Sequence, residues 1–216
     1  MEVMSVMMMR IVLVLTMMTA LASGVERVRD HNRGNPATLR LDLSMPITSV
    51  LLTRGSDTDY QITADIVYQF RQHISDTTRL RLVWGAGITN TYAEGSTRSG
   101  SDDVLYWGLS GRYYMGLSYE FSDRTRLQLV PYIGGGVGYM DVDAPGLRKT
   151  SDDNYLLDYG AQLHVGWNLD HIDLAAGLSW TARRGSHFMA REGGGYQKWV
   201  LHQDHPALHL SVGWRF

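Results

Sequence analysis

The 216-residue chain contains no cysteine, which excludes disulfide bonds, thiolate metal sites and a cysteine nucleophile. Proline is scarce, and 18 of the 20 basic residues are arginines. The formal net charge of -2 gives no reason to expect a nucleic-acid partner. No apolar run reaches the roughly 20 residues of a membrane-spanning helix. Aromatic residues (6 Trp, 12 Tyr, 4 Phe) and 23 glycines are plentiful, and the length suits a single domain.

The start of the chain has the pattern of an export signal. Arg10 precedes an apolar segment at 11–21, and small residues follow it. This arrangement is typical of a secretory signal peptide. We therefore predict a cleaved signal peptide at 1–22, a periplasmic leader at 23–37 and a folded domain at 38–216.

Beyond the leader, apolar and polar residues alternate with a period of two, and the helix period is absent. The segment "ISDTTRLRLVWGAGI" (74–88) is echoed by "FSDRTRLQLVPYIGGGV" (121–137) and again by "WNLDHIDLAAGLSW" (167–180), each being strand, tight turn and strand. Eight strands are predicted, at 38–50, 60–74, 79–92, 105–121, 126–140, 154–168, 172–183 and 205–216.

The connections between these strands alternate in length. Short turns alternate with long polar segments, predicted as loops at 53–59, 93–103, 141–153 and 184–204. An even strand number with this rhythm is typical of outer-membrane barrels. The predicted fold class is all-β: an eight-stranded antiparallel up-and-down transmembrane β-barrel, located in the outer membrane of a Gram-negative bacterium.

The two faces of the predicted strands differ in chemistry. The last strand alternates Leu208, Leu210, Val212, Trp214 and Phe216 with polar residues, and no predicted strand carries a charge on its apolar face. An eight-stranded barrel has room inside only for side chains, so the opposite, charged face is predicted to plug the lumen with arginine–carboxylate pairs. The predicted lumen charges are Arg40, Arg71, Arg81, Arg112, Arg126, Arg183, Arg215, Asp42, Asp65, Glu120, Asp158 and Asp173.

Aromatic residues cluster near the predicted strand ends, as in the interfacial girdles of membrane barrels. On the turn side these are Tyr68, Phe70, Tyr119, Phe121, Trp167, Trp214 and Phe216, and on the loop side Tyr92, Trp107, Tyr139 and Trp180. Alternation alone does not distinguish inside from outside. A soluble, lipocalin-like carrier with its apolar face inward is therefore an alternative, although the Gly-x-Trp of that family is missing from the first strand.

The segment "PYIGGGVGY" (131–139) resembles a strand of the small outer-membrane barrels of the opacity-protein and OmpA/OmpX-like type. The terminal "VGWRF" (212–216) resembles the signal by which the barrel-assembly machinery recognises its clients. The resemblance implies an eight-stranded barrel in contact with the lipid bilayer and lipopolysaccharide, and assembly through the strand ending in Phe216. It implies no particular function, since this fold hosts several.

Two sets of residues suggest catalysis, because some barrels of this size modify lipid A. His209 and Ser211 resemble part of the His-Ser-Glu set of lipid A deacylases. However, they are predicted to face the lumen, as two polar residues of a hydrogen-bonded network. The last predicted loop contains His, Asp and Ser residues, which are the residue types of a lipid A palmitoyltransferase site; its histidines could also bind a metal. These residues are Ser186, His187, His202, Asp204 and His205.

Acidic residues in the predicted loops form a third candidate set. They could hold divalent cations that bridge lipopolysaccharide, or form a solvated rim. They are Asp102, Asp103, Asp141, Asp143, Asp152 and Asp153.

We assign no catalytic, cofactor-binding or metal residues from the sequence. The predicted function is a structural or surface-interaction role, with a plugged lumen and long extracellular loops as the interaction surface; the extracellular ligand is unknown. The alternatives are a lipid A acyl hydrolase or acyltransferase and, third, the soluble carrier.

Overall fold

The computed structural model describes residues 37–48, 51–53, 56–74, 78–97, 103–143 and 147–216. The predicted signal peptide and the leader up to residue 36 lie outside the described residues. No helix in the described part of the chain is long and apolar enough to cross a membrane. The strands are β1 (Ala37–Pro46), β2 (Leu51–Thr53), β3 (Ser56–His73), β4 (Leu80–Thr97), β5 (Asp103–Glu120), β6 (Thr125–Asp143), β7 (Leu147–Leu169), β8 (Ile172–Arg191) and β9 (Tyr196–Arg215).

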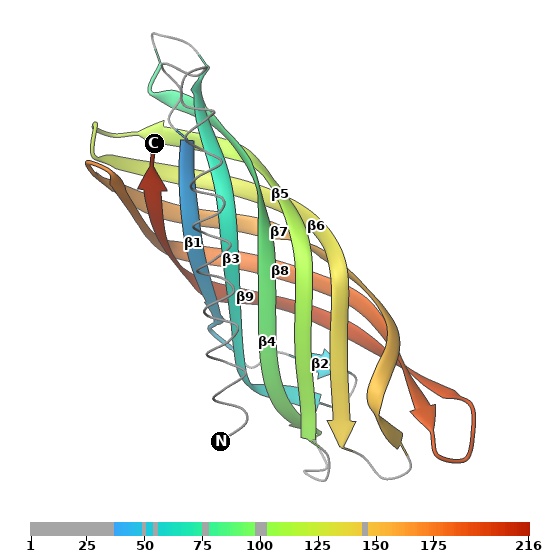
Figure 1. Cartoon of the computed structure of the whole chain (residues 1–216). Helices are drawn as coiled ribbons and strands as arrows, with labels where there is room; N and C mark the ends of the chain where they lie inside the picture. Colours follow the sequence, from blue (N-terminus) through green and yellow to red (C-terminus); the bar gives the residue numbers. More distant parts are fainter. Residues whose placement is uncertain (1–36, 49–50, 54–55, 75–77, 98–102, 144–146) are drawn as a thin grey trace.

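Eight long strands close into a barrel. Each pairs antiparallel with its neighbours, and β1 lies between β3 and β9, where it joins the two ends of the sheet (Figure 1). The short β2 pairs with β3 and extends the wall. Closure gives the spanning backbone groups internal partners, as a strand protein in lipid requires. The predicted eight-stranded antiparallel barrel is confirmed.

The barrel is polar inside and apolar outside. In β9, the side chain of Leu210 is 59% exposed whereas that of its neighbour His209 is fully buried. The same alternation runs along β5, where Arg112 is buried and Tyr113 is exposed. A water-soluble barrel buries its apolar face, so the soluble carrier is wrong, and the predicted orientation of the two faces is confirmed.

The two ends of the barrel differ. One end, called the turn end here, has the short connections and the C-terminus; the other, the loop end, has the remaining connections. Aromatic side chains pack against each other on the outside near the turn end. Phe70 stacks on Trp84 with 4.3 Å between ring centroids, and Tyr119 meets Phe121 edge-on at 5.2 Å.

At the loop end, the strands run farther than predicted. The predicted loop at 141–153 is mostly strand, because β6 continues to Asp143 and β7 begins at Leu147. The predicted loop at 184–204 is a β-hairpin whose turn includes two glycines of positive φ, Gly194 (91°) and Gly195 (85°). In contrast, the first strand ends earlier than predicted, at Pro46.

The outer end of β6 has inverted polarity. Beyond Tyr139, β6 points Asp143 outward and buries Met140 and Val142 inside. These two belong to an apolar group within the lumen, called the outer lumen cluster: Ala93, Val104, Tyr106, Met140, Val142, Leu156 and Leu201. The outer surface of β6 is polar here, as suits contact with water rather than lipid, so this segment does not show an apolar outer face. The β8–β9 hairpin differs, because it exposes Phe188, Tyr196 and Val200.

Candidate functional site: the ion-paired lumen

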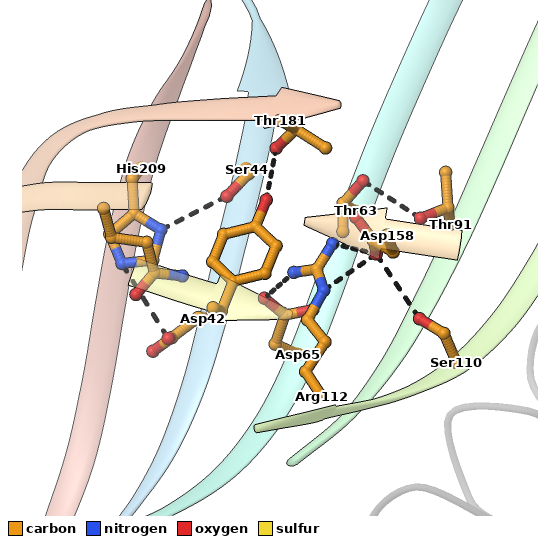
Figure 2. Close-up of polar contacts among 12 residues, drawn as sticks. Asp42, Ser44, Thr63, Asp65, Thr91, Ser110, Arg112, Asp158, Thr181 and His209 are labelled. Atoms are coloured by element: carbon orange, nitrogen blue, oxygen red, sulfur yellow. Dashed lines mark hydrogen bonds and ion pairs between the residues drawn. The ribbon is translucent and has the colours of Figure 1, made fainter. Parts of the chain in front are cut away.

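Arg112 occupies the centre of the lumen and connects carboxylates on two other strands. Its Nη1 donates to Asp65 on β3 at 2.7 Å, and its Nε donates to Asp158 on β7 at 2.8 Å (Figure 2). The guanidinium also lies over the ring of Tyr132, 4.3 Å from its centroid. Tyr114 donates its hydroxyl to Asp65 at 3.3 Å. Arg112 therefore ties opposite walls of the barrel through charge-assisted hydrogen bonds.

A second arginine extends this network toward the loop end. Arg183 on β8 approaches Asp158 at 3.5 Å and donates to the Thr63 hydroxyl on β3 at 3.2 Å. It also reaches the Gln203 side chain at 3.5 Å, which in turn donates to Gln61 at 3.0 Å. Because these partners lie on β3, β7 and β9, the polar layer crosses the lumen.

A third group of polar side chains lies on β1 and on the neighbouring β9. Arg40 donates to both carboxylate oxygens of Asp42. The His209 ring stands 3.8 Å from Asp42 through Nε2 and 3.2 Å from the Ser44 hydroxyl through Nδ1 (Figure 2). The ring stacks on that of His164 at 5.3 Å between centroids.

Nearer the turn end, Asp173 receives two arginines. Arg71 approaches it at 3.2 Å, and Arg126 donates to its other carboxylate oxygen. At the rim, Arg81 pairs with Glu120 at 2.7 Å, and both side chains are partly exposed. The lumen thus contains ion pairs along most of its length.

The buried charges nearly balance. Among the described residues, five arginines face four aspartates with side chains that are at most 5% exposed. Eleven of the twelve predicted lumen charges form ion pairs with one another, and Arg215 is partly buried. The buried charges are Arg40, Arg71, Arg112, Arg126, Arg183, Asp42, Asp65, Asp158 and Asp173. Paired charges thus occupy the middle of the lumen, with arginines and aspartates from different strands in contact.

Glycines in the wall make room for these arginines. Gly134 lies between Arg112 and Asp158 in the strand register, and a Cβ there would come within 2.8 Å of the Arg112 Cγ. A Cβ at Gly166 would lie 2.6 Å from the guanidinium carbon of Arg126. Gly134, the first glycine of the "GGG" run of β6, therefore lets the Arg112 side chain cross one strand to reach a carboxylate on the next.

His209 and Ser211 belong to one polar network in the lumen, in which Ser211 hydrogen-bonds the Asp42 carboxylate. Both residues face the lumen as predicted, but the hydroxyl next to the imidazole is that of Ser44, with Asp42 on the other ring nitrogen. Serine, histidine and aspartate in contact are the parts of a hydrolytic triad. However, Ser44 is 8% exposed and His209 is fully buried, so an acyl chain in the membrane does not meet this hydroxyl.

The candidate residues of the predicted last loop are divided between the two faces of the wall. His187 and His205 are buried in the lumen, whereas His202 and Asp204 are exposed outside. Ser186 contacts the Tyr155 hydroxyl at 3.2 Å. They do not form one site.

Of the acidic candidates, Asp103 and Asp143 are exposed at the loop end, and Asp141 is partly buried. Asp103 and Asp143 pair directly across β5 and β6. Asp102 and the side chains of Asp152 and Asp153 lie outside the described part of the structure. Among the residues that the structure describes, no histidine, aspartate and glutamate side chains are grouped as a metal site would need.

The lumen also contains aromatic and aliphatic residues that the sequence reasoning missed. Tyr114 and Tyr132 belong to an apolar layer beside Arg112, with Val67, Val83 and Val130. The Tyr132 hydroxyl bonds the Thr181 hydroxyl at 2.7 Å. The strict alternation along their strands indicates that these residues point inward. They were missed because the lumen was predicted to be lined by polar residues, and these side chains are largely apolar.

The fold and the lumen define a class: a small transmembrane β-barrel with an ion-paired interior. No protein-family model matches the chain, and no curated protein does. Among solved structures, it resembles Neisserial surface protein A (NspA), with a TM-score of 0.50 and 13% identity over 83% of this chain and 97% of that one. It also resembles the outer membrane protein OprG from Pseudomonas aeruginosa, with a TM-score of 0.44 and 13% identity over 86% of this chain and 97% of that one. A third similar structure is the E. coli Outer Membrane Protein W, with a TM-score of 0.39 and 18% identity over 86% of this chain and 100% of that one. At these identities, the likeness to NspA concerns the fold alone.

Proposed function

We propose that this protein is an outer-membrane barrel of a Gram-negative bacterium with a structural or surface-interaction role and a closed lumen. The observation that carries the proposal is the Arg112 bridge between Asp65 and Asp158, buried in the middle of the barrel. An apolar outer wall suits the lipid bilayer and lipopolysaccharide, and it supports the outer membrane as the location.

The interaction surface in this proposal is the loop end of the barrel, facing the outside of the cell. Its strands rise beyond the aromatic residues and carry polar side chains outward, such as Glu94, Asp143 and Asp204. Export by the cleaved signal peptide at 1–22 and delivery to the barrel-assembly machinery by the strand ending in Phe216 complete the proposal. In its support, the backbone of Phe216 is held against Ala37 on β1 by a 3.0 Å hydrogen bond.

Planar-bilayer recording of the purified barrel tests the closed lumen. We expect at most small and rare conductance, because the paired charges fill the space. The matched comparison is Arg112→Ala, which removes the central bridge and should raise the frequency of openings above that of Arg81→Ala at the rim. Steady, porin-sized conductance of the unaltered protein would contradict the proposal and favour solute transport.

The His209 ring, with Ser44 at one nitrogen and Asp42 near the other, makes lipid A hydrolysis the second candidate. Because Ser44 and His209 are buried, this function would require the lumen to open to the substrate. Mass spectrometry of lipid A from cells with and without the protein separates the two functions. The structural role predicts identical lipid A. A change in acylation that disappears with Ser44→Ala would establish the enzyme instead.

A further inference from the structure

Two histidine rings lie against each other inside the lumen. His164 on β7 and His209 on β9 stack with 5.3 Å between ring centroids and 29° between the ring planes. Both side chains are buried. The stack therefore brings together two groups that each gain a proton at about pH 6.5 in water. The closed lumen of the proposed function assigns no role to this pair.

The hydrogen bonds of the two rings suit their uncharged forms. The Nε2 atom of His164 contacts the side-chain oxygen of Gln128 at 2.7 Å, and Nδ1 of His209 contacts the Ser44 hydroxyl at 3.2 Å. An uncharged imidazole, with one N–H and one acceptor nitrogen, makes either contact. The other nitrogen of each ring is buried and has no hydrogen-bond partner in the described part of the chain.

The carboxylate beside the pair is already bound to a cation. Asp42 lies 3.8 Å from Nε2 of His209, beyond hydrogen-bond distance (Figure 2). Arg40 donates to both oxygens of Asp42 and lies close enough to repel a proton on His164 or His209. A proton on one ring would therefore face the Arg40 cation and the second imidazole.

The strand between the two histidines carries no countercharge. Gly177 on β8 pairs with His164 on one side and with His209 on the other. A Cβ at Gly177 would come within 2.7 Å of the His164 Cβ, so the glycine leaves the space in which the rings stack. A carboxylate at this position of the wall would have offset a proton on the pair.

The other charged groups near the pair leave the lumen with excess positive charge. Arg126 on β6 lies near His164, and Asp65 on β3 and Arg112 on β5 lie near His209. Asp65 is already paired with Arg112. Five buried arginines and four buried aspartates give one net positive charge, and two imidazoliums would raise it to three. Uncompensated buried charge is costly, so a doubly protonated pair opposes the closed state.

We propose that the His164–His209 stack makes the lumen acid-sensitive: two uncharged rings permit the closed lumen, and proton uptake by the pair favours its opening. Water in an open lumen would separate and solvate the two imidazoliums, whereas the closed lumen holds them against each other and against Arg40. Opening is therefore coupled to the uptake of up to two protons. This inference rests on the closed lumen of the proposed function and adds a condition under which the lumen opens.

Planar-bilayer recording of the purified barrel between about pH 7.5 and about pH 5, above the range in which carboxylates ordinarily titrate, tests this coupling. If opening takes up two protons, the open probability rises up to about 100-fold for each unit that the pH falls below about 6.5. His164→Gln and His209→Asn each leave one imidazole, so we expect at most about tenfold per unit. The double variant should show almost no dependence on pH.

His202→Gln is the matched control, because His202 is exposed on β9 and water solvates its charge in both states. His205→Gln shows whether any buried histidine of the lumen has the same effect, since His205 is buried beside Gln61 at 3.2 Å. Both variants should retain the wild-type pH dependence, and heat-modifiable gel migration shows that each variant is folded. A pH dependence that survives in the double variant, or that His205→Gln removes, would overturn the inference.

Nitrogen NMR of the unaltered barrel in lipid nanodiscs follows the same pair without a substitution. The ring nitrogens of His164 and His209 should become protonated over the pH range in which openings increase. Rings that stay uncharged while openings increase, or openings that stay equally rare down to about pH 5, would refute the acid-sensitive pair and leave the closed lumen standing. Steady, porin-sized conductance at neutral pH would instead refute the closed lumen itself.

Discussion

Replacing Arg112 by methionine tests the ion-paired lumen most directly. The substitution keeps much of the side-chain volume but leaves Asp65 and Asp158 without their shared cation. Removing one partner of a buried pair typically costs about 3–5 kcal/mol. Here Asp158 keeps Arg183 at 3.5 Å and Asp65 keeps the Tyr114 hydroxyl at 3.3 Å. We therefore expect the lower end, a loss of about 3 kcal/mol in the free energy of unfolding.

The control is Arg81→Met, which breaks the Arg81–Glu120 pair at the rim. Those side chains are 17% and 20% exposed, so water compensates for the loss and we expect about 1 kcal/mol or less. Reversible urea unfolding in lipid vesicles, followed by tryptophan fluorescence and gel migration, measures both. Adding Asp65→Asn to Arg112→Met should recover part of the loss, because Arg112 is the only cation paired with Asp65 among the described residues, whereas Asp158 keeps Arg183. Equal costs for Arg112→Met and Arg81→Met would refute the view that the lumen network stabilises the barrel.

Three further predictions concern the wall, a buried hydroxyl and assembly. Leu163→Arg places a charge on the lipid face and should lower the free energy of unfolding by roughly 2–4 kcal/mol, whereas Gln162→Arg on the lumen face should lower it much less. Reversible refolding into vesicles measures both, and the reverse order would show that the two faces of the wall are assigned the wrong way round. Tyr132→Phe should cost about 1–2 kcal/mol in urea unfolding, because it leaves the Thr181 hydroxyl unpaired. Phe216→Asp should lower the folded yield in the outer membrane, and a normal yield in membrane fractions would contradict the role of the terminal aromatic as an assembly signal.

The sequence predicted which residues face the lumen but not which of them meet. Alternation assigns Arg112, Asp65 and Asp158 to one face because side chains on a strand alternate strictly. The contacts between them join residues 46 and 47 positions apart in the chain. They depend on how far neighbouring strands are staggered around the closed barrel, which the pattern of one strand does not contain. For the same reason, the sequence did not predict that the His209 ring contacts Ser44 and not Ser211.

The outer end of β6 was missed for a different physical reason, which follows from the surrounding solvent. On β6 the outward positions are Tyr139 and then Asp141 and Asp143, while the inward positions change from glycine to Met140 and Val142. An apolar outer face identifies a strand only where it meets lipid; in water the same strand needs an apolar inner face, as a soluble barrel does. The alternation with an apolar outer face therefore ends at the edge of the membrane. Beyond that edge the sequence predicts a loop, although the strand continues. The reversal after Tyr139 consequently marks the upper edge of the lipid-facing wall on β6.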